Sequence, residues 1–349
     1  MKLIYVVLCI ITINSASVFA QSNFQVKGFG HIETELEYYD ETNDFDMSWA
    51  LGEQSLFVTG TMGKKFSYLG EMTLNYSTHG TYRFNIERTR LKFNYYGNHS
   101  VIIGKFHTPV NYWNDVYFHA RLFFPTSDRP VMFSKWVPVH TFGARMQGQN
   151  LGKYNFGYDL LLGGGMTSED MYNIFDENSI TAAVHIKPVD GMRIGGSFYY
   201  THIADNSASL HHHHDVQQNY SGAIDFHLAS FSFARFEKPL EILNEFSALI
   251  TRTDTLGIAY SYSNYLYLGY NIKDRFTPYV FIDLLQSADN DLRIGPLNQL
   301  KYGIGYKHEF TPALHLKIQF ERYTNVPDWS VNPATKYNEL TLQFSYAIY

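Results

Sequence analysis

The sequence predicts an all-β protein, a transmembrane antiparallel up-and-down β-barrel of about sixteen strands. Three observations lead to this prediction. Apolar and polar residues alternate with a period of two along most of the chain, brief turns alternate with longer polar connections, and no apolar run after the first twenty residues reaches the length of about eighteen that a membrane-spanning helix needs.

The alternation is clearest at residues 24–39, 66–77, 154–162 and 340–348. In the first of these, Phe24, Val26, Ile32 and Leu36 share one face, while Lys27, Glu33, Glu35 and Glu37 share the other. No helical period of comparable strength appears. We count about sixteen such segments, centred near residues 32, 55, 71, 89, 104, 145, 158, 183, 198, 222, 234, 263, 281, 304, 318 and 343.

The connections between these segments fall into two kinds. Short turns are predicted at 62–64, 97–99, 150–152, 188–191, 273–275 and 310–312. Between them fall mostly longer connections, at 40–47, 108–138, 164–177, 204–215, 239–255, 287–297 and 324–336, with only the connection at 78–82 short. A chain that meanders through a membrane has brief turns on the periplasmic side and longer loops outside. A soluble β-sandwich has no reason to keep this order.

One segment gives an energetic test of which face meets lipid. In RFNIERTRLKFNYY (83–96), Arg88, Arg90 and Lys92 share a face opposite Leu91 and Phe93. Each Arg or Lys facing lipid near mid-membrane costs roughly 2–4 kcal/mol, so we expect the basic face to line a watery interior. Taken alone, this strand also fits a soluble β-protein whose basic face meets bulk water.

The first twenty residues have the features of a secretory signal peptide. Lys2 precedes an apolar run from Leu3 to Ile13, and Val18-Phe19-Ala20 is a small-residue cleavage site. The leader contains Cys9, so the mature chain has no cysteine and uses no disulfide. Residues 1–20 are therefore predicted to be the signal peptide, and 21–349 a single barrel. Without the leader, 33 acidic residues face 26 basic ones, which argues against nucleic acid as a partner.

The longest connection, 108–138, is rich in aromatic residues. The stretch IGKFHTPVNYWN (103–114), with SDRP (127–130) and PVHTFG (138–143) downstream, resembles Gram-negative outer-membrane porins of the phosphate-selective porin O and P type. The last strand, LTLQFSYAIY, is similar to the assembly signal of such barrels, which ends in an aromatic residue. The resemblance implies a passive diffusion channel located in the outer membrane of a Gram-negative bacterium.

In porins the third external loop folds into the lumen and narrows it, and 108–138 is the third external connection here. Pro109 removes a donor from the strand ladder and ends the strand. The alternative is an external loop packed over the rim. The predicted constriction residues are His107, Pro109, Asn111, Tyr112, Trp113, Asp115 and Arg129.

A basic wall is the second predicted feature of the lumen. Its members lie on three consecutive strands with inward parity, and they would enrich anions in the channel. The alternative is that inward carboxylates such as Glu71, Asp159 or Glu33 pair with these side chains and cancel their field. The predicted wall consists of Arg88, Arg90, Lys92, Lys105 and Arg145.

Other groups give weaker signals. His211–His214 with Asp215 is a metal-binding pattern, but adjacent histidines in a loop are more often incidental, so we expect no metal and no cofactor. His107, His119 and His140 are expected to pack among aromatics at the rim. The tyrosines of YSYSNYLYLGY (260–270) are expected to lie in an interface belt. No spacing of Ser, His and Asp singles out a catalytic set, so no enzyme activity is expected.

The sequence therefore predicts a porin with a water-filled channel for small hydrophilic solutes, with anion preference as an expectation. The alternative is a loop-occluded barrel that acts as a surface-binding or structural protein. Expected partners are outer-membrane lipid and lipopolysaccharide and small solutes or ions, with a homotrimer as the candidate assembly.

Overall fold

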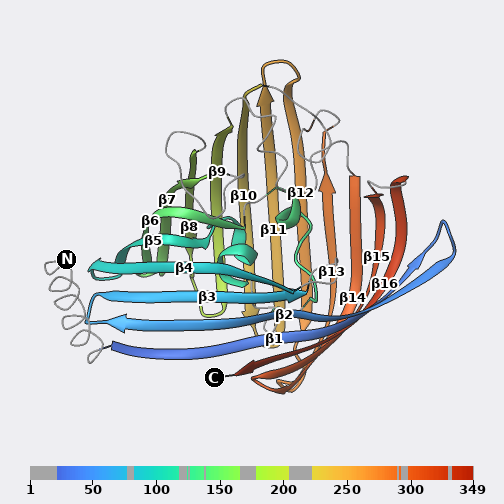
Figure 1. Cartoon of the computed structure of the whole chain (residues 1–349), viewed down its shortest axis with the longest axis horizontal. Coiled ribbons are helices and arrows are strands. Elements are labelled where there is room, and N and C mark those ends of the chain that lie inside the picture. Colours follow the sequence, from blue (N-terminus) through green and yellow to red (C-terminus); the bar gives the residue numbers. More distant parts are fainter. Residues whose placement is uncertain are drawn as a thin grey trace, which may run out of the picture.

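A computed structural model of the chain describes residues 22–76, 82–117, 124, 126–136, 139–165, 178–203, 222–288, 291, 298–328 and 332–348. Within them, sixteen antiparallel strands close into one barrel, each paired with its neighbours in sequence (Figure 1). The strands are β1 (Ser22–Tyr39), β2 (Asp44–Met62), β3 (Phe66–Tyr76), β4 (Tyr82–Tyr96), β5 (His99–His107), β6 (His140–Leu151), β7 (Phe156–Gly164), β8 (Asn178–Ile186), β9 (Met192–Ile203), β10 (Ile224–Glu237), β11 (Leu240–Thr253), β12 (Gly257–Tyr270), β13 (Phe276–Gln286), β14 (Asn298–Thr311), β15 (Leu314–Asp328) and β16 (Asn332–Ile348). Two short helices, η1 (Trp113–Tyr117) and α2 (Met132–Lys135), lie in the β5–β6 connection.

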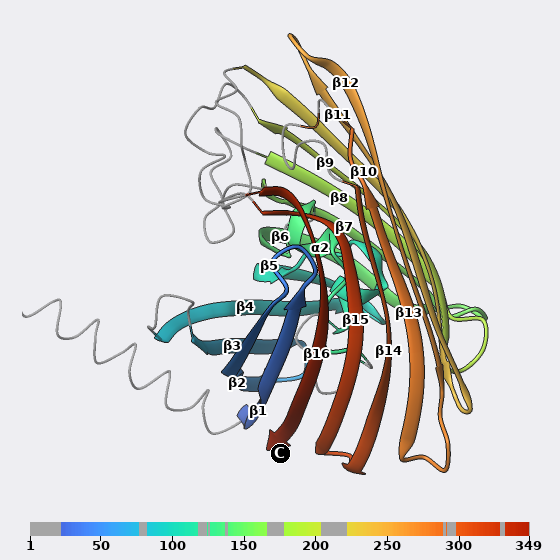
Figure 2. The same cartoon turned by 90° about the vertical axis from the view of Figure 1, so that its right-hand side faces the viewer.

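The first and last strands complete the ring. β1 and β16 pair from Gly28↔Ile348 to Tyr39↔Tyr337, and Figure 2 shows them side by side. Closure pairs the backbone groups of both potential edge strands, which a sheet surrounded by hydrocarbon requires because lipid offers no hydrogen-bond partners. The predicted fold class, a transmembrane up-and-down barrel, is confirmed.

The two faces of the barrel differ in polarity. Large apolar side chains such as Trp49, Phe84, Leu162 and Ile304 are exposed on the outside. The inward positions are rich in buried charged and polar groups, among them Glu71, Asp159, Glu245, Lys317 and Glu321. This arrangement is the reverse of a soluble protein, and it is the one expected where lipid surrounds the sheet. Among the described residues, no helix is long and apolar enough to cross a membrane.

Strand boundaries in the middle of the chain differ from those predicted. The separate strands expected near 222 and 234 are one strand, β10, and the long connection expected at 239–255 is wrong because β11 occupies Leu240–Thr253. The number of strands still agrees with the prediction, because one strand too many near 222 and 234 offsets the one missed at β11. Pro239, the first residue of the connection expected there, lies in a tight turn between β10 and β11, where a missing backbone donor costs nothing.

Several external connections are also shorter than expected. β1 ends at Tyr39 and β2 begins at Asp44, so half of the connection predicted at 40–47 is strand. The connection predicted at 324–336 shrinks similarly, because β15 reaches Asp328 and β16 starts at Asn332. The β5–β6 connection between His107 and His140 keeps its full length.

A β-bulge in β4 keeps two consecutive residues on the lumen side. The register with β3 shifts between Glu71↔Arg88 and Met72↔Ile86, so Glu87 is an extra residue. The exposed apolar positions change parity across it, from Phe84 and Ile86 to Leu91. Glu87 accepts a hydrogen bond from the buried Thr73 hydroxyl (2.8 Å). The bulge thus lets an acidic and a basic residue both face inward.

Candidate channel constriction

The described residues of the connection 108–139 lie inside the ring of strands rather than over its rim. Its two ends are tied together, since the Thr108 backbone N–H donates to the Val139 carbonyl oxygen (3.0 Å) and the Thr108 and Thr141 hydroxyls are 2.7 Å apart. Between these ends, the described loop residues include some of the most deeply buried side chains, such as Val110, Met132 and Trp136. Figure 2 shows α2 surrounded by strands.

Apolar packing attaches the loop to one side of the barrel. Trp113 stacks on Phe133 with ring centroids 5.3 Å apart and meets Phe124 edge-on at 5.5 Å. The loop and the inner wall of β9–β13 share one hydrophobic cluster. On the wall side it contains Tyr199, Phe226, Leu228, Ala234, Leu243, Leu249, Tyr265, Tyr267, Tyr279, Phe281 and Leu285.

The tyrosines of β12 therefore divide between the two faces. Tyr260, Tyr262 and Tyr270 are exposed on the outside, as an interface belt requires, but Tyr265 and Tyr267 are buried in the loop cluster. The prediction of a belt for the whole 260–270 run is wrong for these last two. Strand parity explains the difference, because only alternate residues can face lipid.

Wall side chains also hold the backbone of the loop. A Glu245 carboxylate oxygen accepts the Trp113 N–H (2.7 Å), and an Asp283 carboxylate oxygen accepts the Val131 N–H (2.7 Å). The Asn111 amide donates to the Ser247 hydroxyl (3.0 Å). Since the loop has few backbone partners of its own, these wall acceptors satisfy donors that would otherwise be buried without a partner.

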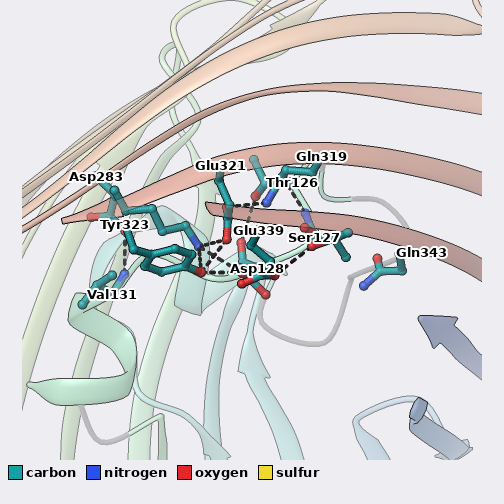
Figure 3. A network of polar contacts seen from close by, with 12 residues as sticks. Thr126, Ser127, Asp128, Val131, Asp283, Gln319, Glu321, Tyr323, Glu339 and Gln343 are labelled. Atoms are coloured by element: carbon teal, nitrogen blue, oxygen red, sulfur yellow. Dashed lines mark hydrogen bonds and ion pairs between the residues drawn. The ribbon is translucent and has the colours of Figure 1, made fainter. Parts of the chain in front are cut away.

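A charged network fixes the far end of the loop (Figure 3). The Lys301 ammonium lies 2.9 Å from an Asp128 oxygen and 3.2 Å from a Glu321 oxygen. Asp128, Glu321 and Glu339 offer oxygens within 4.8 Å of one another, the one grouping among the described residues with metal-ligand spacing. Because Lys301 already lies among these oxygens, the cluster is a lysine-centred network that joins the loop to β14, β15 and β16.

At the near end, Asp115 bridges the loop to two arginines of the wall. Its carboxylate is 2.6 Å from an Arg193 nitrogen and 3.3 Å from an Arg145 nitrogen. Arg145 also pairs with Asp159 (2.7 Å). Burial by itself would raise the pKa of Asp115, but the charges of Arg193 and Arg145 outweigh burial and hold this pKa below its usual range.

Beside Asp115 lies a pocket of about 320 Å³. Most of its lining is basic or amide-bearing, and it comes from β4, β5, β6, β8, β9 and the loop. The lining residues are Arg88, Arg90, His107, Asp115, Val116, Arg145, Gln147, Gln149, His185, Lys187 and Arg193. A second pocket of about 450 Å³ shares Arg90 and adds Lys92 with polar residues of β1–β3. Both pockets are lined mainly by inward-facing residues and so belong to the lumen.

The predicted basic wall divides by pairing. Arg88 is bonded to Glu71, and Arg145 to Asp159, as the cancelling alternative anticipated. Within the described part of the chain, the side chains of Arg90 and Lys92 have no hydrogen bond or ion pair. Lys105 follows Gly104, whose φ is +130°, and its ammonium donates to the Ile86 carbonyl oxygen (3.1 Å), away from both pockets.

The predicted constriction residues also occupy different places. His107, Asp115 and the exposed neighbour Val116 border the basic pocket. Pro109, Asn111 and Trp113 are buried against the wall, and Tyr112 lies between Phe236 and the Arg193 guanidinium, 5.4 Å from the latter. Arg129 is half-buried in the loop.

Of the histidines singled out in the sequence, the structure describes His107 and His140. His107 and His140 lie ring to ring at 5.2 Å, and His140 is 3.4 Å from Glu87. His119, His211–His214 and Asp215 lie outside the described residues.

Sequence reasoning missed several residues of the site. Arg193, His185, Glu245, Asp283 and Lys301 all hold or border the loop. Glu245 was assigned to a connection, and Arg193 follows a turn directly, where alternation gives little signal. Asp283 and Lys301 could have been found, because each is a charged residue at an inward position of a strand.

Comparisons with known proteins support the fold. No protein-family model and no curated protein sequence matches the chain. Among solved structures, it is similar to an anion-selective porin from Comamonas acidovorans (TM-score 0.65, 11% identity, covering 94% of this chain and 100% of that one). It is also similar to the channel DcaP of Acinetobacter baumannii (TM-score 0.60, 10% identity, 94% and 98% covered) and to a trimer form of OmpT of Vibrio cholerae (TM-score 0.63, 9% identity, 93% and 99% covered). The chain thus has the fold of outer-membrane porins. The finer resemblance to the phosphate-selective type stays a prediction.

Proposed function

We propose that the protein is a porin in the outer membrane of a Gram-negative bacterium, a water-filled channel through which small hydrophilic solutes diffuse passively. The observation that carries this proposal is the combination of an apolar exterior with a hollow, charged lumen that a folded loop fills only in part. A sixteen-stranded barrel is wide enough to leave an aqueous path. The signal peptide (1–20) would deliver the chain for export, and N-terminal sequencing of the mature protein tests its cleavage.

The loop 108–138 is proposed as the constriction. The mature chain is expected to lack cysteine, so a single cysteine gives clean chemistry. Val116, which is 45% exposed and borders the basic pocket, is the site for Val116→Cys. A bulky charged thiol reagent should lower single-channel conductance in a planar bilayer. The matched control is Val189→Cys, exposed in the turn between β8 and β9, where the same reagent should have no effect.

Anion preference is the finer part of the proposal. Arg90 and Lys92 bring unpaired positive charge to the pockets, which attracts anions into a confined lumen. Reversal potentials in a salt gradient should indicate anion preference, and Arg90→Gln with Lys92→Gln should reduce it. The control pair, Arg88→Gln with Glu71→Gln, removes an internally neutralised ion pair and should leave the reversal potential nearly unchanged. Cation preference of the unmodified protein would contradict this part.

A loop-occluded barrel with a binding or structural role is the second candidate. It is favoured by the hydrophobic cluster that fills the β9–β13 side of the lumen. Single-channel conductance separates the two: steady open currents support the porin, and a folded protein without conductance supports the occluded barrel. A homotrimer is the proposed assembly, and the mass of the detergent-solubilised protein tests it.

A further inference from the structure

The hairpin of β1 and β2 extends beyond the strands beside it (Figure 1). β2 pairs with β1 from Asp44 to Met62, but its pairing with β3 begins only at Gln54. At the same end of the barrel, β4 starts at Tyr82, which is 60% exposed on the outer face, as tyrosines at a membrane interface are. The segment 44–51 of β2 thus lies past the level where β3 and β4 end, and no described strand pairs with its second side.

The turn between β3 and β4 is too short to cover this open edge. β3 ends at Tyr76 and β4 starts at Tyr82, and the residues between them lie outside the described part of the chain. Continuing the register of β2 and β3 places Tyr76 opposite Gly52. A turn of this length, which has to leave and return, extends at most roughly 9 Å past that point, whereas Met47 lies about 16 Å further along β2. The turn therefore cannot reach Met47.

The backbone of this segment directs hydrogen-bonding groups to its open side. The Asp40 N–H donates to the Lys336 carbonyl oxygen beside β16 (3.0 Å), and N–H groups point to alternate sides along a strand. The odd-numbered residues of β1 therefore bond to the even-numbered residues of β2, which leaves the N–H and C=O groups of the odd-numbered residues in 45–51 on the open side. In agreement, the Met47 N–H donates to the Asp46 carboxylate (2.8 Å) rather than to a strand.

The two faces of this edge carry different side chains. On the outer face, Phe45, Met47 and Trp49 are 70%, 56% and 72% exposed. Large exposed apolar side chains that cluster in this way mark binding surfaces. The inner face is acidic, since β2 contributes two exposed carboxylates and the paired positions of β1 contribute two more. These residues are Asp44, Asp46, Glu35 and Glu37.

From these observations we infer that the open edge of β2 at 44–51 binds an extended segment of another protein, in which apolar residues alternate with Lys or Arg. Such a segment adds a strand to the sheet and pairs the open backbone groups. Its apolar side chains cover Phe45, Met47 and Trp49, and its basic side chains meet the acidic inner face. A second copy of this chain fits less well, because it brings the same acidic face. The inference goes beyond the proposed channel and does not require conductance.

The test is calorimetric titration of the full-length mature protein, in nanodiscs of zwitterionic lipid, with two synthetic peptides of equal composition. In one peptide Val and Lys alternate, and in the other they form two blocks. The alternating peptide should bind with saturation and the block peptide at least about tenfold more weakly. Met47→Pro removes an open-side donor that no described strand uses, and Asp44→Asn with Asp46→Asn removes acidic charge, so both should weaken binding by a similar factor. The control is Asp254→Asn, an exposed carboxylate in the turn between β11 and β12, which should leave the affinity unchanged.

Hydrogen exchange resolved to single amides locates the bound peptide. The amides of Phe45, Met47 and Trp49 should exchange fast in the free protein and slowly with the alternating peptide, whereas those of Asp46 and Ser48, which face β1, should exchange slowly in both. Equal affinity for the two peptides, or unchanged affinity in Met47→Pro, overturns the inference. Slow exchange at Phe45, Met47 and Trp49 that depends on protein concentration without peptide means that a second copy occupies the edge, and the inference of a basic segment is then wrong. Electrophoretic mobility of unheated samples verifies that each variant is a folded barrel.

Discussion

The two sides of the lumen wall differ in how they meet the same loop. Toward β9–β13, the loop side chains Trp113, Met132 and Phe133 enter a buried hydrophobic cluster like that of a soluble domain. Toward β4–β6, the loop offers Asp115 to a wall of arginines, and space remains between them. Apolar side chains gain by excluding water, whereas the arginines of the other side need either water or an anion. A partly filled barrel follows from this division.

Of the changes considered, removing Trp113, the main apolar side chain that attaches the loop to the wall, should alter the channel most. Trp113 is only 2% exposed, and truncating a buried Trp to Ala costs roughly 3–5 kcal/mol. In Trp113→Ala this cost falls on the docking of the loop, so single-channel conductance should rise and its noise should increase. The control is Trp49→Ala, which changes an exposed residue on the outer face. Equal conductance in both variants would mean that the loop does not limit the current.

The outer and inner faces of β4 should differ in how well they tolerate a positive charge. Leu91 is exposed on the outside of β4, near its middle. Leu91→Arg should lower the free energy of unfolding in lipid vesicles by roughly 2–4 kcal/mol, the cost of a cation in hydrocarbon. Asn94→Arg, on the opposite parity of the same strand, should change it far less. If both variants lose the same stability, the assignment of faces in β4 is wrong.

Much of the fold could be predicted from the sequence because its strongest signal is local. Alternation at residues 24–39 and 340–348 marks β1 and β16 without knowledge of any contact. β11 gave no such signal, because Asn244 interrupts its apolar face and Glu241 and Glu245 make the segment resemble a polar loop. Glu245 was therefore expected in a connection, whereas as a residue of β11 it faces inward and holds the loop by accepting the Trp113 N–H.

The site was less predictable because pairing depends on register and on the path of the loop. Parity predicts that Arg88 and Arg145 face the lumen, but only the ladder shows Glu71 opposite Arg88. The contact between Asp115 and Arg193 joins residues 78 positions apart. No local pattern encodes such a contact, because it depends on how a long segment packs against a distant wall.

Replacing the polar anchor of the loop should have a smaller effect than replacing the apolar one. The buried Glu245 side chain accepts the Trp113 N–H, and a typical buried hydrogen bond contributes about 0.5–1.5 kcal/mol. Glu245→Leu removes the acceptor and should raise the noise of the open channel. Glu245→Gln keeps a carbonyl oxygen in place and serves as the matched control. If Leu and Gln behave alike, this hydrogen bond does not position the loop.

The smallest effect is expected at the Arg322–Asp40 ion pair. It joins the same two residue types as Arg193–Asp115, but its side chains are more exposed. Arg322 donates to both carboxylate oxygens of Asp40, with side chains 23% and 33% exposed, compared with 13% for both Arg193 and Asp115. The hydrogen bonds from Arg322 hold the pKa of Asp40 below its usual value. The contribution of this pair to stability is therefore present above the pKa of the unfolded carboxyl and lost as pH falls through the folded one, so it does not change between neutral and mildly acidic pH.

Because water and salt screen the Arg322–Asp40 pair, Asp40→Asn should leave the free energy of unfolding and the conductance unchanged within error. Asp115→Asn removes one carboxylate from an Arg–Asp pair in the same way, but it changes the charge of a confined pocket. Measuring both variants at low and high salt separates the effect of environment from that of chemistry. If Asp40→Asn alters conductance as strongly as Asp115→Asn, the current responds to charge anywhere on the barrel, and the confined pocket has no special role.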